Sequence, residues 1–246
     1  MVENNIVKQT RKVEELEQFG KTLTGLPKET LKKQKAIVMR EIRTKYGLLG
    51  ILPFFIKVSQ EQRALKRKYP EAYQKALQLS EDTAKEITML IGMFNVIAKK
   101  EGKENAYEFV KSIFQKVAVH SMPALYQFND LVKCEGDTFE NFIKFNTAWF
   151  KAMNEAGTWI VDELKEEKDE QTIIITECAN CELGNAFNCP EIAKLGCDHD
   201  LAGFPVILDK VNAEFRRPHT IAKGDEYCDF HFYRKGTAPD TEHLNK

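Results

Sequence analysis

The chain has 246 residues, of which 43% are hydrophobic, so it can bury a core as one large domain or two small ones. Its 36 lysine and arginine residues nearly balance its 37 aspartate and glutamate residues. This balance argues against nucleic acid or an anionic membrane as a partner. From Gln171 to Lys246 the chain carries 8 basic and 12 acidic residues, which further argues against a basic nucleic-acid groove there.

The N-terminal segment Met1–Gly20 is charged and lacks the apolar run of about 7 to 15 residues that an export signal needs. We therefore expect a cytoplasmic protein, in which six cysteines serve as thiols, ligands or nucleophiles rather than as disulfides. The most apolar stretch, Tyr46–Ile56, is shorter than the roughly 20 residues that span a bilayer. We interpret it as a buried helix junction, with a membrane-surface segment as the alternative.

Apolar residues recur at helical spacing from Lys8 to about Glu166, and glycine or proline separates the periodic segments. Ser80 and Asp137 are expected to cap helices, Gly102 to end one, and Pro70 to break or kink another. The predicted helices cover residues 28 to past 46, 51–78, 81–101, 105–119 and 138–156.

The charged run Asp162–Glu170 marks a change in composition, because strand signals follow it and helical periodicity precedes it. Strands are predicted over 171–178, 214–222 and 227–234, with Gly224 in a hairpin connection between the last two. We place a soft boundary near residue 168, between a helical part (1–168) and a sheet part (169–246), although one continuous domain is an alternative. The predicted fold class is α+β, a helical part packed on an antiparallel sheet of at least three strands, with the site between them.

Five of the six cysteines and four of the five histidines lie in the last 76 residues. Cys178 and Cys181 have the Cys-x-x-Cys spacing of a metal site or a redox couple, but Cys189 and Cys197 are too far apart for a zinc ribbon. No long helix is expected after Cys178 to lower its thiol pKa, which argues against a thioredoxin-like couple. A structural role is favoured for both cysteines of the pair.

Alternation along the last predicted strand places Cys228 and Phe230 on one face and Asp229 and His231 on the other. The first face is typical of a core and the second of a polar surface or pocket wall. By spacing alone, Cys228 is a small buried hydrophobe and His231 an exposed strand residue.

The segment Thr220–Phe232 (TIAKGDEYCDFHF) resembles the C-terminal signature of the L-2-amino-thiazoline-4-carboxylic acid hydrolase family, a Thr-aliphatic-Ala step, Gly-Asp, two variable residues and Cys-Asp-Phe-x-Phe. Upstream, Cys197-Asp-His-Asp200 resembles the Cys-x-x-Asp element that precedes this signature, and Cys178 falls where an earlier family cysteine is expected. The resemblance covers about residues 178 to 232.

The resemblance implies hydrolytic opening of a small cyclic thiazoline acid to a carbamoylated cysteine. The chain is also similar to four-vinyl-reductase-like domains, which bind a small ligand, so a non-catalytic ligand-binding or sensing module is the alternative function. A cleft that holds a cysteine, a histidine and an aspartate would favour the enzyme. Burial of the Asp229 and His231 face without a polar cavity would favour the module.

Ring opening requires attack on an amidine-like carbon, a proton for the leaving group and an anchor for the carboxylate. Either Cys197 or Cys228 can attack as a thiolate, with His199, His219 or His231 as the base; alternatively, a divalent metal such as zinc can activate water. The catalytic candidates are Cys197, Asp200, Cys228, Asp229 and His231, and the substrate-binding candidates are Arg217 and His219.

If the two Cys-Asp elements act together, the sulfurs of Cys197 and Cys228 lie close in space. Helical spacing also lets Phe142, Phe145 and Trp149 form either core or the apolar wall of the pocket. The expected partner is a small-molecule substrate, and a homo-oligomer is compatible with the sequence.

Overall fold

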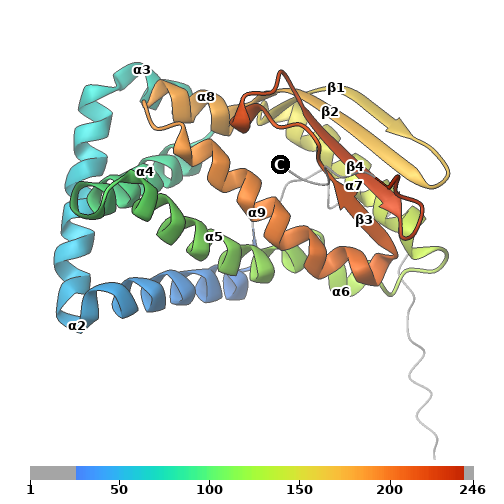
Figure 1. The fold of residues 1–246 in the computed structure, drawn as a ribbon, viewed down its shortest axis with the longest axis horizontal. Coiled ribbons are helices and arrows are strands. Elements are labelled where there is room, and N and C mark those ends of the chain that lie inside the picture. Colours follow the sequence, from blue (N-terminus) through green and yellow to red (C-terminus); the bar gives the residue numbers. More distant parts are fainter. Residues whose placement is uncertain (1–25, 241–246) are drawn as a thin grey trace, which may run out of the picture.

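The structure, a computed structural model, describes residues 26–240 (Figure 1). The segment Met1–Gly20 and His243 lie outside the described residues. The helices are α2 (Lys28–Lys68), α3 (Pro70–Leu79), α4 (Glu81–Glu101), α5 (Lys103–Leu125), α6 (Phe128–Leu131), α7 (Thr138–Glu155), α8 (Ala179–Ala186) and α9 (Glu191–Leu208). The strands are β1 (Trp159–Glu166), β2 (Glu170–Cys178), β3 (Ala213–Arg216) and β4 (Cys228–Arg234). The fold is α+β, as predicted.

The predicted helix ends are confirmed where a cap determines them. The hydroxyl of Ser80 accepts a hydrogen bond from the N–H of Thr83 at 2.9 Å, and the Asp137 carboxylate accepts one from the N–H of Glu140 at 2.9 Å. Gly102 ends α4 at φ 86°, in the left-handed region that glycine favours. Pro70 begins α3, where the missing proline N–H costs nothing.

Helix α2 bends sharply at Gly47, which has φ 71° and ψ 172°, so its two legs meet at a corner of the molecule (Figure 1). The expectation of a buried helix junction here is wrong for most of the apolar run. Leu48, Leu49 and Leu52 are 66%, 91% and 70% exposed, whereas Phe54 is buried against α4 and α5. These exposed leucines follow the bend at Gly47 in the chain.

The four strands form one antiparallel sheet in the order β1-β2-β4-β3. Two details of the prediction are corrected. Residues 159–166, which we expected to end the helical part, form the edge strand β1. The tight hairpin around Gly224 is absent from the described chain, because β3 stops at Arg216, two residues before Pro218, whose ring nitrogen has no hydrogen for a ladder bond.

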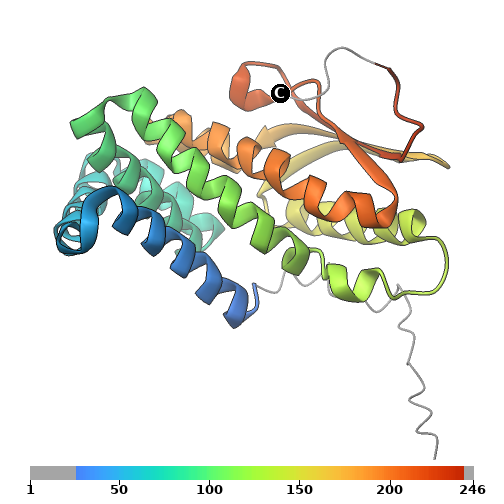
Figure 2. The same ribbon diagram turned by 60° about the horizontal axis from the view of Figure 1, so that its bottom comes forward.

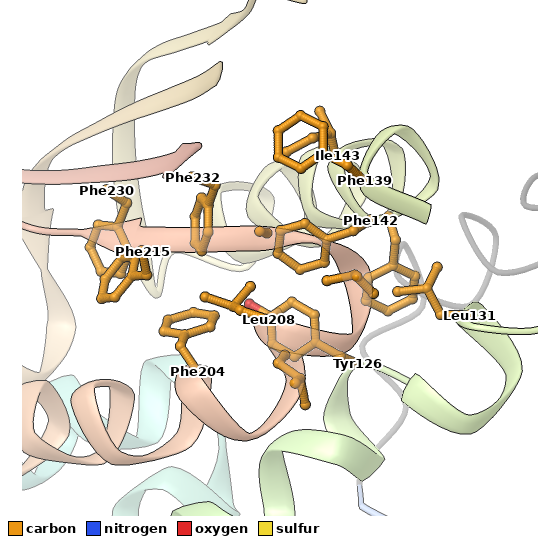
Figure 3. Packing of buried hydrophobic residues seen from close by; sticks show 14 of the residues in the cluster. Tyr126, Leu131, Phe139, Phe142, Ile143, Phe204, Leu208, Phe215, Phe230 and Phe232 are labelled. Atoms are coloured by element: carbon orange, nitrogen blue, oxygen red, sulfur yellow. The ribbon is translucent and has the colours of Figure 1, made fainter. Parts of the chain in front are cut away.

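One core lies between the sheet and helices α7 and α9 (Figure 3). The ring of Phe232, fully buried, lies 5.2 Å from that of Phe204 on α9 and 5.5 Å from that of Phe142 on α7. Such edge-to-face contacts stabilise aromatic clusters beyond simple area burial. Phe142, Phe145 and Trp149 belong to this core.

A second core joins α2, α3, α4 and α5 to α8 and the first turns of α9. Helices α5 and α9 lie side by side along the length of the molecule (Figures 1 and 2) and contribute to both cores. Ile192 and Leu195 of α9 enter the second core, and Phe204 and Ile207 enter the first. The intervening turn of α9, which contains Cys197 and Asp200, therefore lies between the cores. Within residues 26–240, no helix is long and apolar enough to cross a membrane.

Candidate active site

A cavity of about 240 Å³ opens where the middle of α9 faces the end of β2. Its apolar lining comes from α5, β1, β2 and β4: Phe114, Trp159, Ile175 and Phe230. Its polar lining comes from β2, α8, α9, β4 and the segment after β3: Cys178, Asn180, Cys197, His199, Asp200, Arg217 and Cys228. Phe142, Phe145 and Trp149 are not in this lining, so the wall that we considered for them is supplied by other aromatic residues.

Arg217 is the largest fully buried side chain of the described residues, with 1% of its area exposed. One guanidinium nitrogen donates to Oδ2 of Asp200 at 3.0 Å, and another donates to the carbonyl of Cys197 at 3.0 Å. The guanidinium also lies 5.3 Å from the ring centre of Phe230, within the range of a cation–π contact. These contacts hold a charged pair, one cation and one anion, in the cavity wall.

The sulfurs of Cys197 and Cys228 share one partner, the buried hydroxyl of Thr220. The Thr220 oxygen lies 3.2 Å from the sulfur of Cys197 and accepts a hydrogen bond from the thiol of Cys228 at 3.5 Å. The two sulfurs therefore cannot be further apart than the sum of these distances, which confirms the predicted proximity. The 31 positions between them in the sequence are bridged because α9 packs against the segment that precedes β4.

Cys178 is the last residue of β2 and the N-cap of α8. We expected no long helix after Cys178, and α8 is indeed short, with 8 residues. The pKa of Cys178 is lowered to about 7, chiefly because the Cys181 thiol hydrogen-bonds to its sulfur, while burial acts in the opposite direction and the backbone N–H groups of Cys181 and Asn180 lower it further. By contrast, burial raises the pKa of Cys197 to about 11 and also raises that of Cys228.

His199 completes the polar wall and has a defined tautomer. Its Nε2 lies 3.3 Å from the oxygen of Ser121, whose own hydrogen is donated to the carbonyl of Val117 at 2.9 Å. The Ser121 oxygen therefore accepts from Nε2–H, which leaves Nδ1 of the neutral ring without a proton. Nδ1 lies 3.7 Å from Oδ1 of Asp200.

The other three candidate residues do not line this cavity. Asp229 and His231 point to the opposite face of β4 from Cys228, because side chains alternate along a strand. There Oδ2 of Asp229 lies 2.7 Å from Nδ1 of His219 and 3.5 Å from Nε2 of His231, whose Nδ1 lies 3.2 Å from Glu170. The seven candidates thus divide into a cavity group (Cys197, Asp200, Arg217 and Cys228) and a group on the other face of the strand.

The family model for L-2-amino-thiazoline-4-carboxylic acid hydrolase matches residues 81–232, which is more than half of the chain. The chain belongs to this family. The matched region contains every residue that lines the cavity, including those that our sequence comparison left out. No curated protein sequence matches the chain.

Membership of this hydrolase family gives the polar cavity a chemical context, since hydrolysis needs a nucleophile, a base and a polar anchor together. Metal activation was an alternative for the nucleophile. Among residues 26–240, no group of three or more His, Cys, Asp or Glu side chains is arranged to hold a metal ion.

Two features of the cavity were not evident from the sequence. Cys178 lines the cavity, which its Cys-x-x-Cys spacing does not indicate. His199 was only one of three histidines considered as base, and its support from Ser121 on α5 could not be found without the packing of α5 on α9.

Proposed function

We propose that the cavity is an active site that hydrolyses a small cyclic amidine acid of the L-2-amino-thiazoline-4-carboxylate type. The observation that carries this proposal is the convergence of three thiols, His199, Asp200 and Arg217 on one cavity of about 240 Å³. This volume lies below the range of about 300 to 1,000 Å³ that is usual for drug-sized ligands, and it suits a single small ring.

The charges of the cavity complement such a substrate. An amino-thiazoline acid carries an amidinium at one end and a carboxylate at the other, and the cavity wall carries the Asp200 carboxylate and the Arg217 guanidinium. In the bound state, Arg217 would contact the substrate carboxylate and Asp200 the amidinium. The paired arrangement keeps both groups neutralised before substrate enters, which limits the cost of their burial.

The alternative, a binding or sensing module, needs a cavity but no base beside a thiol. The lining contains a cysteine, a histidine and an aspartate, and Nδ1 of His199 is available to accept a proton. This combination favours the enzyme.

The test is to incubate the purified protein with L-2-amino-thiazoline-4-carboxylate and to measure N-carbamoyl-L-cysteine by mass spectrometry. We expect product from the wild type and a loss of at least about a hundred-fold in rate for Asp200→Asn. The substrate analogue that lacks the carboxylate is the matched ligand control and should react poorly. Thermal stabilisation by the acid without any turnover would support the binding module and overturn the enzyme.

A further inference from the structure

We infer that Cys178 is the nucleophile of this reaction and forms a covalent intermediate with the substrate beside the first turn of helix α8. This inference rests on the proposed function and extends it, because neither the family signature nor the Cys-Asp elements assign a role to this residue. Its basis is the position of three cysteines in one cavity wall, of which only one has a geometry suited to attack.

Cys197 and Cys228 are engaged by protein groups. Both sulfurs contact the Thr220 hydroxyl, and the sulfur of Cys228 also accepts from the N–H of Ile221 at 3.3 Å. Cys228 is 6% exposed and belongs to the sheet core. These contacts fix the two thiols as parts of the wall.

Cys178 differs in its backbone setting. It is extended, with φ −130° and ψ 118°, at the junction where β2 becomes α8, and like Cys197 it is half-buried, whereas Cys228 is buried. The first N–H groups of a helix have no partner within the helix and favour a negative charge nearby. The N-cap position therefore places a thiolate of Cys178 at the positive end of the α8 dipole.

The electrostatics agree with this geometry. A lowered pKa increases the thiolate fraction of Cys178 at neutral pH, whereas burial raises the pKa of Cys197 and decreases its thiolate fraction. The groups that face Cys178 act in both directions: the Cys181 thiol and the α8 amides lower its pKa, and the Asp200 carboxylate on α9 raises it. Hydrogen bonding to Cys178 and burial keep the pKa of Cys181 far above its usual value, so Cys181 remains a protonated donor.

The proposed reaction needs no oxidant or reductant. The Cys178 thiolate attacks the ring carbon between nitrogen and sulfur, and a C–S bond to the enzyme forms. The ring C–S bond breaks, and the released substrate sulfur takes up the proton of the substrate amidinium, which leaves a neutral isothiourea on Cys178. Water, deprotonated by Nδ1 of His199, then attacks the same carbon. Cys178 leaves as a thiolate, and the carbamoyl product retains the oxygen of water.

A sulfur nucleophile that replaces a sulfur leaving group makes the first step nearly balanced in energy. In the second step, the lowered pKa of Cys178 favours its departure. Cys181 acts as a positioning residue, because it donates to Cys178 and does not contact the reacting carbon.

The first experiment needs no substrate. Wild-type protein is treated with iodoacetamide from pH 5 to pH 10, and labelling of each cysteine is followed by peptide mass spectrometry. We expect Cys178 to label first, with a rate that rises through about pH 7, and Cys181→Ala to shift that rise to higher pH. Prior labelling of Cys197 or Cys228 near neutral pH would overturn the inference.

The second experiment compares Cys178→Ser with Cys189→Ser, a buried cysteine outside the cavity, after circular dichroism has shown that both fold. We expect Cys178→Ser to lose on the order of 10³-fold or more in kcat and Cys189→Ser to lose little. Acid quenching of wild type should trap an adduct of the mass of one substrate molecule on Cys178.

The two hypotheses fail in different ways. Absence of turnover by the wild type would contradict the proposed function. Turnover by Cys178→Ser at the normal rate would leave the hydrolase intact and overturn the role of Cys178.

Discussion

The hydroxyl oxygen of Thr220 lies 3.2 Å from the sulfur of Cys197, and this contact ties the segment before β4 to the middle of α9. The same oxygen accepts from the thiol of Cys228, and the Thr220 side chain is fully buried. One hydroxyl therefore holds together the two family elements that the sequence separates.

Removal of that hydroxyl should destabilise the protein. We expect Thr220→Val, which keeps the shape of the side chain, to lower the free energy of unfolding by about 1 kcal/mol, because two sulfurs lose their partner. It should also raise the pKa of Cys197 further, since the Thr220 hydroxyl lowers it in the wild type. Urea unfolding and the alkylation rate of Cys197 measure the two effects, and Thr220→Ser, which retains the hydroxyl, is the control.

The pairing of Arg217 with Asp200 predicts that a second substitution restores part of the stability lost by the first. Arg217→Met should lower the free energy of unfolding by about 3 kcal/mol, because Asp200 is left without its cationic partner. The double variant Arg217→Met, Asp200→Leu should recover part of this loss. The unfolding free energy of Arg217→Lys should lie between those of wild type and Arg217→Met, since an ammonium keeps the charge but lacks the planar fork of the guanidinium. Chemical denaturation of wild type, Arg217→Met, Asp200→Leu and the double variant completes the cycle; a double variant less stable than Arg217→Met would contradict the pairing.

The cluster on the opposite face of β4 predicts a pH dependence. Burial lowers the pKa of His231, but hydrogen bonds to Asp229 and Glu170 outweigh it, so the pKa in the folded state lies above the ordinary 6.5. The stabilisation by His231 is therefore fully present below pH 6.5 and is lost as the pH rises through the folded-state pKa. The difference in unfolding free energy between wild type and His231→Gln should be larger at pH 5.5 than at pH 8.5. An equal difference at both values would rule out a charged His231.

The close contact of α5 and α9 predicts a steric effect at a glycine. A Cβ added at Gly203 of α9 would lie 2.2 Å from Cγ of Met122 on α5, close to the α5 backbone rather than at a flexible tip. We expect Gly203→Ala to cost about 1 to 3 kcal/mol of stability and to displace the turn that carries Asp200. Thermal unfolding tests this, and Met122→Ala in the same chain should restore stability. If Met122→Ala did not restore stability, the loss caused by Gly203→Ala would have a cause other than this contact.

Much of the fold followed from local signals that act within a few residues. Ser80, Asp137 and Pro70 mark helix ends through hydrogen bonds or a missing donor, and these are readable from sequence. The edge strand β1 was not predicted, because its outward-facing charged residues resemble those of an exposed helix in the sequence. Such charges protect a sheet edge from pairing with other chains. The exposure of Leu49 depends on the bend at Gly47, which composition does not reveal.

The site was predictable only in part, because some of its geometry depends on contacts between segments that are distant in the sequence. The family elements pointed to Cys197 and Cys228, and their proximity was predicted on the hypothesis that the two elements act together. The division between the cavity and the opposite face depends on which side of β4 meets α9, and the state of Cys178 depends on a short helix without clear apolar periodicity. Both are properties of packing between distant segments.

The passage of α5 and α9 through both cores has a consequence for how the protein unfolds. Strand β1, before residue 168, also pairs with β2 after it, so no cut near that boundary leaves a complete core. We expect circular dichroism to show that residues 169–246 alone are unfolded.

In the full chain, tryptophan fluorescence reports the sheet side and far-ultraviolet circular dichroism reports mainly the helices, and we expect the two melting curves to coincide. Two separate transitions would contradict this cooperativity. With a single transition, a destabilising change in α2 or α3 would lower the amount of active protein while leaving the rate constants of each folded molecule unchanged.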